Sequence, residues 1–176
     1  MQERITKKLY REQDQQRRNN PNTELFTLHD GPPYANGSLH MGHFVNKVIK
    51  DIINRDKLMQ GYRVNYVPGW DCHGLPIELK AVEKLKKKEN TNSKDSDTDM
   101  DHTDSPAKLQ HANEIRKLAM DHATETIEEQ KQGFERWGVM ADWDSNENTY
   151  RTMDASYEYN ELGKVIIGSC LCFSLS

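Results

Sequence analysis

The stretch HDGPPYANGSLHMGH, residues His29–His43, gives the first indication of how this chain folds. A short apolar run, Leu25–Leu28, precedes it and is typical of a β-strand. From Gly42 to Met59 apolar residues recur at a spacing of three to four, which predicts a helix with one apolar face. A loop rich in glycine and proline between a strand and a helix brings phosphate groups to the N-terminus of that helix. The stretch therefore predicts a nucleotide-binding turn.

A second stretch, PGWDCHGLPIE at Pro68–Glu78, follows another predicted strand at Arg63–Val67. Strand, helix and strand within about forty residues make a βαβ unit, whose two strands are parallel. Ligands of open α/β sheets bind at the carboxyl ends of the strands, where Asp71 stands. We therefore predict an α/β fold with parallel strands, preceded by an N-terminal helix.

Composition divides the chain into five segments. They are an N-terminal helical extension (1–20), the βαβ part (21–85), a low-complexity insertion (86–106), a long helix with its continuation (107–160) and an apolar tail (161–176). The first helix is polar, with only Ile5 and Leu9 on its apolar face. Gly61 is the predicted C-cap of the βαβ helix, and the long helix is predicted to begin at Ser105-Pro106 and to end at Gly138.

The insertion contains five aspartates, at positions 95, 97, 99, 101 and 104, and its composition predicts a solvated, disordered segment. The alternation of Asp95, Asp97 and Asp99 resembles a calcium-binding loop. Met100, however, stands where such a loop needs its turn glycine, and Pro106 stands where it needs its bidentate glutamate. We therefore exclude a calcium site.

Overall composition limits the possible functions. The net charge of −4 gives no general attraction to nucleic acid, and no run of eighteen apolar residues is present that could span a membrane. The three cysteines indicate a reducing compartment, and Cys72-His73 has no second ligand pair with which to form a zinc site. The N-terminus has no apolar core of a signal peptide, and its acidic residues are atypical of an organellar transit peptide.

His40 and His43 lie on one face of the predicted helix start, beside free backbone N–H groups and the positive end of the helix dipole. In that position they can stabilise negative charge on a phosphate during reaction without forming a covalent bond. Gly42, between them, lets a base or ribose approach the backbone. The alternative is that both histidines are ordinary exposed polar residues.

Asp71 could hold the ammonium group of a substrate, with carbonyl oxygens of the Pro32-Pro33 turn as partners. The alternative is a structural one, in which the carboxylate caps its own loop by accepting from the N–H of His73 or Gly74.

These stretches resemble a known family. GSLHMGH is similar to the His-x-Gly-His signature of class I aminoacyl-tRNA synthetases. HDGPPYANGSLHMGHFVNKVIKDI and PGWDCHGLPIELK resemble the isoleucine-specific enzymes of bacteria and mitochondria, and residues 134–144 are also similar to them. Valine enzymes usually have Thr-Asp-His-Ala-Gly, and leucine enzymes Asp-Ala-Phe-Gly, where this chain has Trp70–Gly74. The resemblance covers roughly residues 1–160 apart from the insertion.

The resemblance implies the first half of a Rossmann-type catalytic domain that forms isoleucyl-adenylate from isoleucine and ATP and transfers the isoleucyl group to tRNA(Ile). It implies that His40 and His43 are catalytic, and that magnesium accompanies ATP without a metal site on the protein. It further implies ATP contacts by His40, Gly42, His43 and Asn36, and isoleucine contacts by Pro32, Tyr34, Trp70 and Asp71. It also implies a monomer in the mitochondrial matrix, with the cytoplasm as the alternative.

From about Glu161 the family continues into an editing domain, a Lys-Met-Ser-Lys-Ser loop and tRNA-binding domains, whereas Lys164–Ser176 resembles no part of the family. We therefore expect a truncated N-terminal fragment that is weakly stable and inactive alone. The alternatives are a non-catalytic module that binds an adenylate or a partner, a fragment of a valine or leucine enzyme, or a chain that does not fold.

Overall fold

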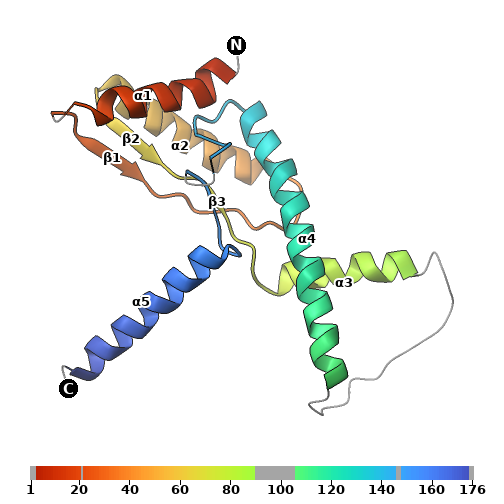
Figure 1. The fold of residues 1–176 in the computed structure, drawn as a ribbon. Helices are drawn as coiled ribbons and strands as arrows, with labels where there is room; N and C mark the ends of the chain where they lie inside the picture. The colour runs from red at the N-terminus through yellow and green to blue at the C-terminus, as the bar shows by residue number, and fades with distance from the viewer. Residues whose placement is uncertain (1–2, 21, 90–105, 146–147, 175–176) are drawn as a thin grey trace.

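The computed structural model describes residues 3–20, 22–89, 106–145 and 148–174 (Figure 1). The aspartate-rich run and Ser105 lie outside these ranges. The elements in chain order are a π-helical turn (Arg4–Lys8), α1 (Leu9–Arg18), β1 (Leu25–Leu28), α2 (Met41–Met59), β2 (Arg63–Tyr66), β3 (Gly69–Trp70), α3 (Leu75–Glu89), α4 (Pro106–Arg136), β4 (Tyr150–Arg151) and α5 (Ala155–Ser174).

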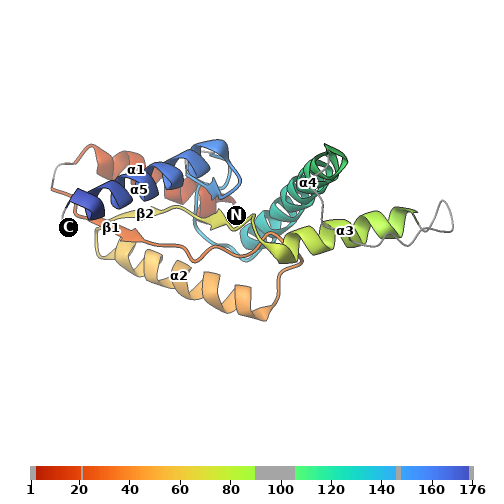
Figure 2. The ribbon, with the colours of Figure 1, turned by 90° about the horizontal axis from the view of Figure 1, so that it is seen from below.

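The predicted βαβ unit is confirmed. Strands β1 and β2 are parallel and in register from Leu25 opposite Arg63 to Leu28 opposite Tyr66. Helix α2 connects them and lies on one side of the two strands, while α1 lies on the other side (Figure 2). The helix ends before Gly61, whose φ of +98° is the left-handed conformation predicted for a C-cap glycine. A second pair, β3 and β4, continues from the carboxyl end of β2 and is also parallel.

Helix α1 contacts the sheet through polar as well as apolar groups. Of the two residues predicted for its apolar face, Leu9 packs against the core and Ile5 is 45% exposed, while the ring of Tyr10 lies in the core. The buried side chains are Thr6, Tyr10 and Gln13. Gln13 donates to the Val64 carbonyl (2.8 Å) and accepts from its N–H (3.0 Å). These bonds use backbone groups of β2 that a neighbouring strand would otherwise use, and they explain why a polar face is buried.

The sequence predicts an apolar side for helix α2 but not which side of the helix faces the sheet. Its apolar stripe faces outward, and the exposed members of the stripe are Met41, Val45, Ile49, Ile52 and Met59. The side chains that α2 buries are Lys47 and Asn54. The helix is amphipathic as predicted, but in this chain the sheet contacts its polar side and nothing described covers the apolar one.

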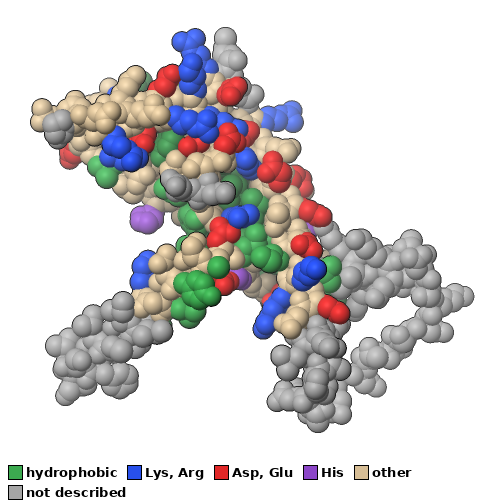
Figure 3. All heavy atoms as spheres, viewed as in Figure 1, with side chains coloured by type: hydrophobic (Ala, Val, Ile, Leu, Met, Phe, Trp, Pro, Cys, Tyr) green, Lys and Arg blue, Asp and Glu red, His purple; other side chains and the backbone are tan. Residues whose placement is uncertain are grey.

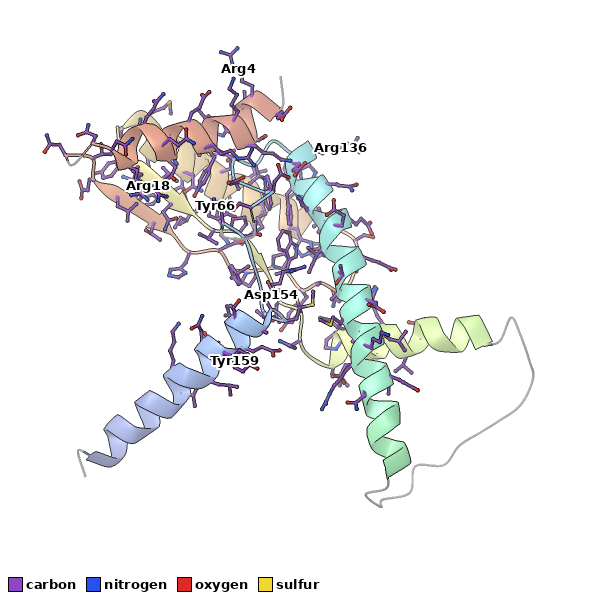
Figure 4. The ribbon with its side chains drawn as sticks, in the orientation of Figure 1. Arg4, Arg18, Tyr66, Arg136, Asp154 and Tyr159 are labelled. Atoms are coloured by element: carbon purple, nitrogen blue, oxygen red, sulfur yellow. The ribbon has the colours of Figure 1, made fainter. Side chains whose placement is uncertain are left out.

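The hydrophobic core forms where the strands meet α4 and the segment that follows it. Trp143 lies between Phe134 and Trp70, with ring centroids 5.7 and 6.1 Å apart. Tyr66 of β2 is fully buried and lies inside the body, whereas Arg4 and Arg18 point outward from the N-terminal helix (Figure 4). Figure 3 shows the hydrophobic side chains of this face gathered where the strands, α4 and the start of α5 meet.

Three helices extend from this body. Helices α3 and α4 cross each other and form an arm, and α5 projects separately from the end of β4 (Figures 1 and 2). Helix α4 begins at Pro106, as predicted, and the turn after it contains Gly138 with a φ of +81°. Helix α5 runs through the boundary at residue 161 that we drew from composition. Among the described residues, no helix is both long and apolar enough to cross a membrane.

Candidate nucleotide site

The two signature histidines cap the start of α2. His40 is the N-cap residue, and its Nδ1 accepts a hydrogen bond from the Gly42 N–H at 3.0 Å. His43 Nδ1 accepts from the His40 N–H at 3.2 Å. The two imidazole rings stack, with centroids 3.9 Å apart. The pair forms a reciprocal capping box, which fixes the direction of both rings.

The capping bonds determine the tautomer of each histidine. A ring nitrogen that accepts from a backbone N–H carries no proton, so in the neutral ring the proton is on Nε2. Both histidines therefore present an Nε2–H donor away from the helix. The backbone N–H groups of His40 and Gly42 are hydrogen-bonded to the rings. The donors available to a phosphate include the imidazoles themselves.

The electrostatic surroundings keep His43 neutral. Partial burial, together with the nearby His40 and Lys47, lowers the pKa of His43 below its usual value. A neutral ring retains both the Nδ1 acceptor of the cap and the Nε2–H donor. The capped arrangement is therefore the stable one at neutral pH.

The local structure explains why position 42 is a glycine. A Cβ at this position would lie 2.9 Å from Cε1 of His40, too close for a real contact. The glycine thus makes room for the capping ring, in addition to the close approach of a ligand that the sequence predicts.

The loop before the helix is joined to the segment around Asp71 by backbone hydrogen bonds. The Ala35 N–H donates to the Asp71 carbonyl at 2.8 Å, and the Asp71 N–H donates to the Pro33 carbonyl at 2.9 Å. Tyr34 and Asp71 thereby form an isolated parallel bridge. The structure therefore brings the two sequence stretches together.

The carboxylate of Asp71 is partly used within its own loop. Its Oδ1 accepts from the His73 N–H at 3.2 Å, which is the structural alternative weighed from the sequence. Asp71 is half-buried, so this bond also orients the carboxylate. A role in holding a substrate ammonium stays a prediction.

The other predicted contact residues differ in accessibility. Tyr34 is 51% exposed, and Pro32 and Asn36 are half-buried. Trp70 is 2% exposed and packs in the core against Trp143. In the present structure Trp70 therefore supports the site from below and does not line an open surface.

Sequence reasoning missed a buried charged cluster beneath the site. Asp30 accepts from Lys47 Nζ, from Lys50 Nζ at 2.9 Å and from the Gly69 N–H at 3.2 Å. Lys47 also lies 3.3 Å from the hydroxyl of Tyr66. One carboxylate thus joins the loop, α2 and the start of β3. The spacing of His43, Lys47 and Lys50 on one helix face is the signal that could have revealed it.

Burial dominates the electrostatics of this cluster. It lowers the pKa of Lys47, an effect that the Asp30 carboxylate opposes, and it raises the pKa of Tyr66. Because Lys47 and Asp30 are both almost fully inaccessible to water, each needs the other for its charge to be tolerated.

Two cavities lie near the joined stretches. One, of about 500 Å³, is lined by residues that follow Asp71 in sequence and by others from the helices, among them Cys72, His73, Ile77, Arg116, Met120 and Glu158. The other, of about 390 Å³, lies at the carboxyl ends of β1 and β2 beside Asp30 and Tyr150. His40 and His43 line neither of these two cavities; His40 is exposed and His43 is half-buried. Within the described ranges, no group of three or more histidine, cysteine or acidic side chains could hold a metal ion.

The chain belongs to the class I tRNA synthetases. The family model described as tRNA synthetases class I (I, L, M and V) matches residues 2–165.

Among its relatives, the chain is 51% identical over 144 residues to an isoleucine--tRNA ligase of Prochlorococcus marinus and 52% identical over 140 residues to one of Crocosphaera subtropica. It is 53% identical over 137 residues to the mitochondrial isoleucine--tRNA ligase of Gallus gallus. These matches cover 82%, 80% and 78% of the chain but only 13%, 12% and 12% of the relatives.

The fold is similar to that of a LeuRS from Agrobacterium radiobacter, solved as a ternary complex with tRNA and LeuAMS. The TM-score is 0.54 at 20% identity, and the likeness covers 85% of this chain and 15% of the other. This likeness supports the fold class. The predicted fold, a parallel α/β unit of a class I synthetase catalytic domain, is therefore confirmed.

Proposed function

We propose that this chain carries the ATP- and isoleucine-binding part of an isoleucine--tRNA ligase. The observation that supports the proposal most strongly is the capped histidine pair at the start of α2, on a loop joined by backbone bonds to the Asp71 segment. The three relatives described above, each about half identical to the chain, are isoleucine--tRNA ligases.

In the proposed reaction, a carboxylate oxygen of isoleucine attacks the α-phosphorus of ATP. A P–O bond forms, the bond from that phosphorus to the bridging oxygen breaks, and pyrophosphate leaves. The Nε2–H donors of His40 and His43 stabilise the negative charge that builds on the α-phosphate oxygens. Gly42 and Asn36 contact the nucleotide. A hydroxyl of the terminal ribose of tRNA(Ile) then attacks the carbonyl carbon and AMP leaves.

Isoleucine is held beside the Tyr34–Asp71 bridge. The carboxylate of Asp71 and the carbonyl of Pro32 accept hydrogen bonds from its ammonium group, and Tyr34 and Trp70 shape its surroundings. Magnesium arrives with the phosphates of ATP as part of the substrate, as is usual for an ion that prefers phosphate oxygens and water. The chain spans about an eighth of the length of these relatives.

Binding of a non-hydrolysable isoleucyl-adenylate analogue, isoleucyl sulfamoyl adenosine, tests the proposal by calorimetry. We expect the analogue to bind, and to bind more tightly than its valyl and leucyl counterparts. The His43→Ala variant should bind at least about tenfold more weakly, since it loses one donor and the cap. No binding by the unmodified chain, or no effect of the substitution, would refute the proposal.

A second candidate is a non-catalytic module that binds a protein partner. The exposed apolar stripe of α2 favours it, because a stripe of this kind is unusual on a free surface. A chain that binds no adenylate analogue but stays folded would support this candidate over the first.

We also propose a compartment and an oligomeric state for the chain. The mitochondrial relative from Gallus gallus supports a mitochondrial matrix location, and the bacterial relatives keep the cytoplasm as the alternative. We propose a monomer. Fractionation of cells with an antibody to this chain distinguishes the two compartments.

A further inference from the structure

We propose that Gln130, on the long helix α4, is a positioning residue that holds the nucleotide loop in its binding conformation. The proposal rests on the function proposed above and concerns a residue far from both signature stretches in sequence. Gln130 lies in α4, which follows the insertion, and it reaches back more than ninety residues to the loop.

The geometry of Gln130 suits this role. Its side chain is completely buried. The single Nε2 group donates to the Tyr34 carbonyl at 3.1 Å and to the Gly37 carbonyl at 2.7 Å. Both amide hydrogens are therefore used, and they bridge the two ends of the turn Tyr34–Gly37. No hydrogen-bond partner for Oε1 is present in the described part of the chain.

Other groups of the arm act on the same turn. Lys80 of α3 donates from Nζ to the Asn36 carbonyl, which lies in the same turn between the Tyr34 and Gly37 carbonyls that Gln130 binds. On α4, Gly133 leaves space for Leu39, because a Cβ there would lie 2.3 Å from Leu39 Cδ1. Ser38 Oγ lies 3.3 Å from Glu129. The loop is thus held by the arm on one side and by Asp71 on the other.

The consequence for the site is direct. Tyr34 and Asp71 form the bridge at which isoleucine is proposed to bind, and the turn leads into the cap at His40. A turn that is released from Gln130 keeps its covalent connections but samples more conformations. Ligand binding then includes the free-energy cost of ordering it.

The variant that tests the role is Gln130→Met. Methionine has a similar length and removes both donors, and it also removes the buried oxygen that lacks a partner. The core should therefore tolerate it, while the carbonyls of the turn lose their donors. The matched control is Gln132→Met, an exposed position on the same helix.

Amide hydrogen exchange measured by NMR on the whole chain gives a readout that needs no ligand. We expect exchange at the bridging amides of Ala35 and Asp71 to accelerate about tenfold in Gln130→Met, with exchange at Tyr66 of β2 unchanged. The affinity for isoleucyl sulfamoyl adenosine should fall by a similar factor. The control variant should change neither quantity.

Three results would overturn the proposal. Unchanged exchange at Ala35 would show that Gln130 does not hold the turn, and equal acceleration at Tyr66 would show a general structural role. If both Gln130→Met and the volume-matched Gln130→Glu unfold, Gln130 likewise has a general structural role. If the unmodified chain binds no analogue, the proposed function fails, whereas the exchange measurement still decides whether Gln130 positions the turn.

Discussion

The two outer edges of the β1–β2 sheet differ in whether their backbone groups have hydrogen-bond partners. Along the outer edge of β2, α1 supplies the partners that a third strand would supply. Tyr10 Oη bonds to both the N–H and the carbonyl of Tyr66 at 3.1 Å, and Gln13 does the same at Val64. Along the outer edge of β1, no strand or side chain among the described residues pairs with the backbone. One edge is closed by a helix and the other is open.

The difference shows where the sheet can grow. An unpaired strand edge and an exposed apolar helix face are both surfaces that further polypeptide can cover. The α1 side is complete, because its buried groups are hydrogen-bonded and its outer surface is polar. On the α2 side, the stripe from Met41 to Met59 remains in water. The two sides should therefore respond differently to substitution.

The largest effect is expected where α2 is attached to the sheet by a buried ion pair. Lys47→Met leaves the Asp30 carboxylate inaccessible and without its buried partner, which should lower the free energy of unfolding by about 4 kcal/mol. Urea denaturation measures the change. Lys8→Met, at an exposed position in the π-helical turn before α1, is the control and should have almost no effect. A loss below about 1 kcal/mol would show that the pair does not attach α2.

Closure of the β2 edge gives the next largest effect. Gln13→Leu leaves the N–H and the carbonyl of Val64 buried and without partners, which should cost about 3 kcal/mol. Gln16→Leu on the exposed side of α1 should change stability by no more than about 0.5 kcal/mol. Equal effects of the two substitutions, measured by thermal unfolding, would mean that α1 does not close the edge.

The exposed apolar stripe of α2 should tolerate charged side chains. The double substitution Ile49→Lys and Ile52→Lys should change the free energy of unfolding by less than about 1 kcal/mol, because both side chains are more than half exposed. It should also reduce self-association in sedimentation measurements, since it interrupts the apolar stripe. A cost of several kcal/mol would place the stripe in the core and would remove the contrast between the two sides.

The smallest effect on the free energy of unfolding is expected when the pH is lowered. Burial tends to raise the pKa of Asp142, but hydrogen bonds from Arg11 and Asn148 outweigh it and hold the pKa below 3.8. The folded state thus holds this proton less tightly than the unfolded state. The stabilisation is present above pH 3.8 and is lost as pH falls through the folded pKa. In the Asp142→Asn variant, the free energy of unfolding should depend less steeply on pH below pH 3.8. An unchanged pH dependence would show that Arg11 does not attach α1 through this carboxylate.

The course of the chain through the βαβ unit could be predicted from local signals. Short apolar runs, a glycine-rich turn and helical periodicity place β1, α2 and β2 within a residue or two, and Gly61 and Gly138 end their helices as predicted. The direction in which α2 faces could not be predicted, because periodicity shows that a helix has an apolar side but not what covers that side. The polar contacts of Gln13 and Asp30 depend on tertiary partners that sequence spacing does not reveal.

In the candidate site, too, some residues could be predicted from local sequence signals and others could not. His40, Gly42 and His43 come together because they are neighbours on one helix start, and Asp71 follows its strand as expected. Gln130 and Lys47 were missed because each acts across a long sequence separation and each resembles an ordinary polar helix residue. The helix spacing of His43, Lys47 and Lys50 was a sequence signal for the second of these, whereas the contact of Gln130 with the loop is visible only in the fold.

The most direct test of the central claim is an NMR titration of the isotope-labelled chain with isoleucyl sulfamoyl adenosine. If the chain carries the proposed site, the largest chemical-shift changes will occur at the amides of Tyr34, His40, Gly42 and Asp71, with the α2 stripe near Ile52 unaffected. The absence of any shift at saturating analogue, or shifts confined to α5 and the α2 stripe, would contradict the claim.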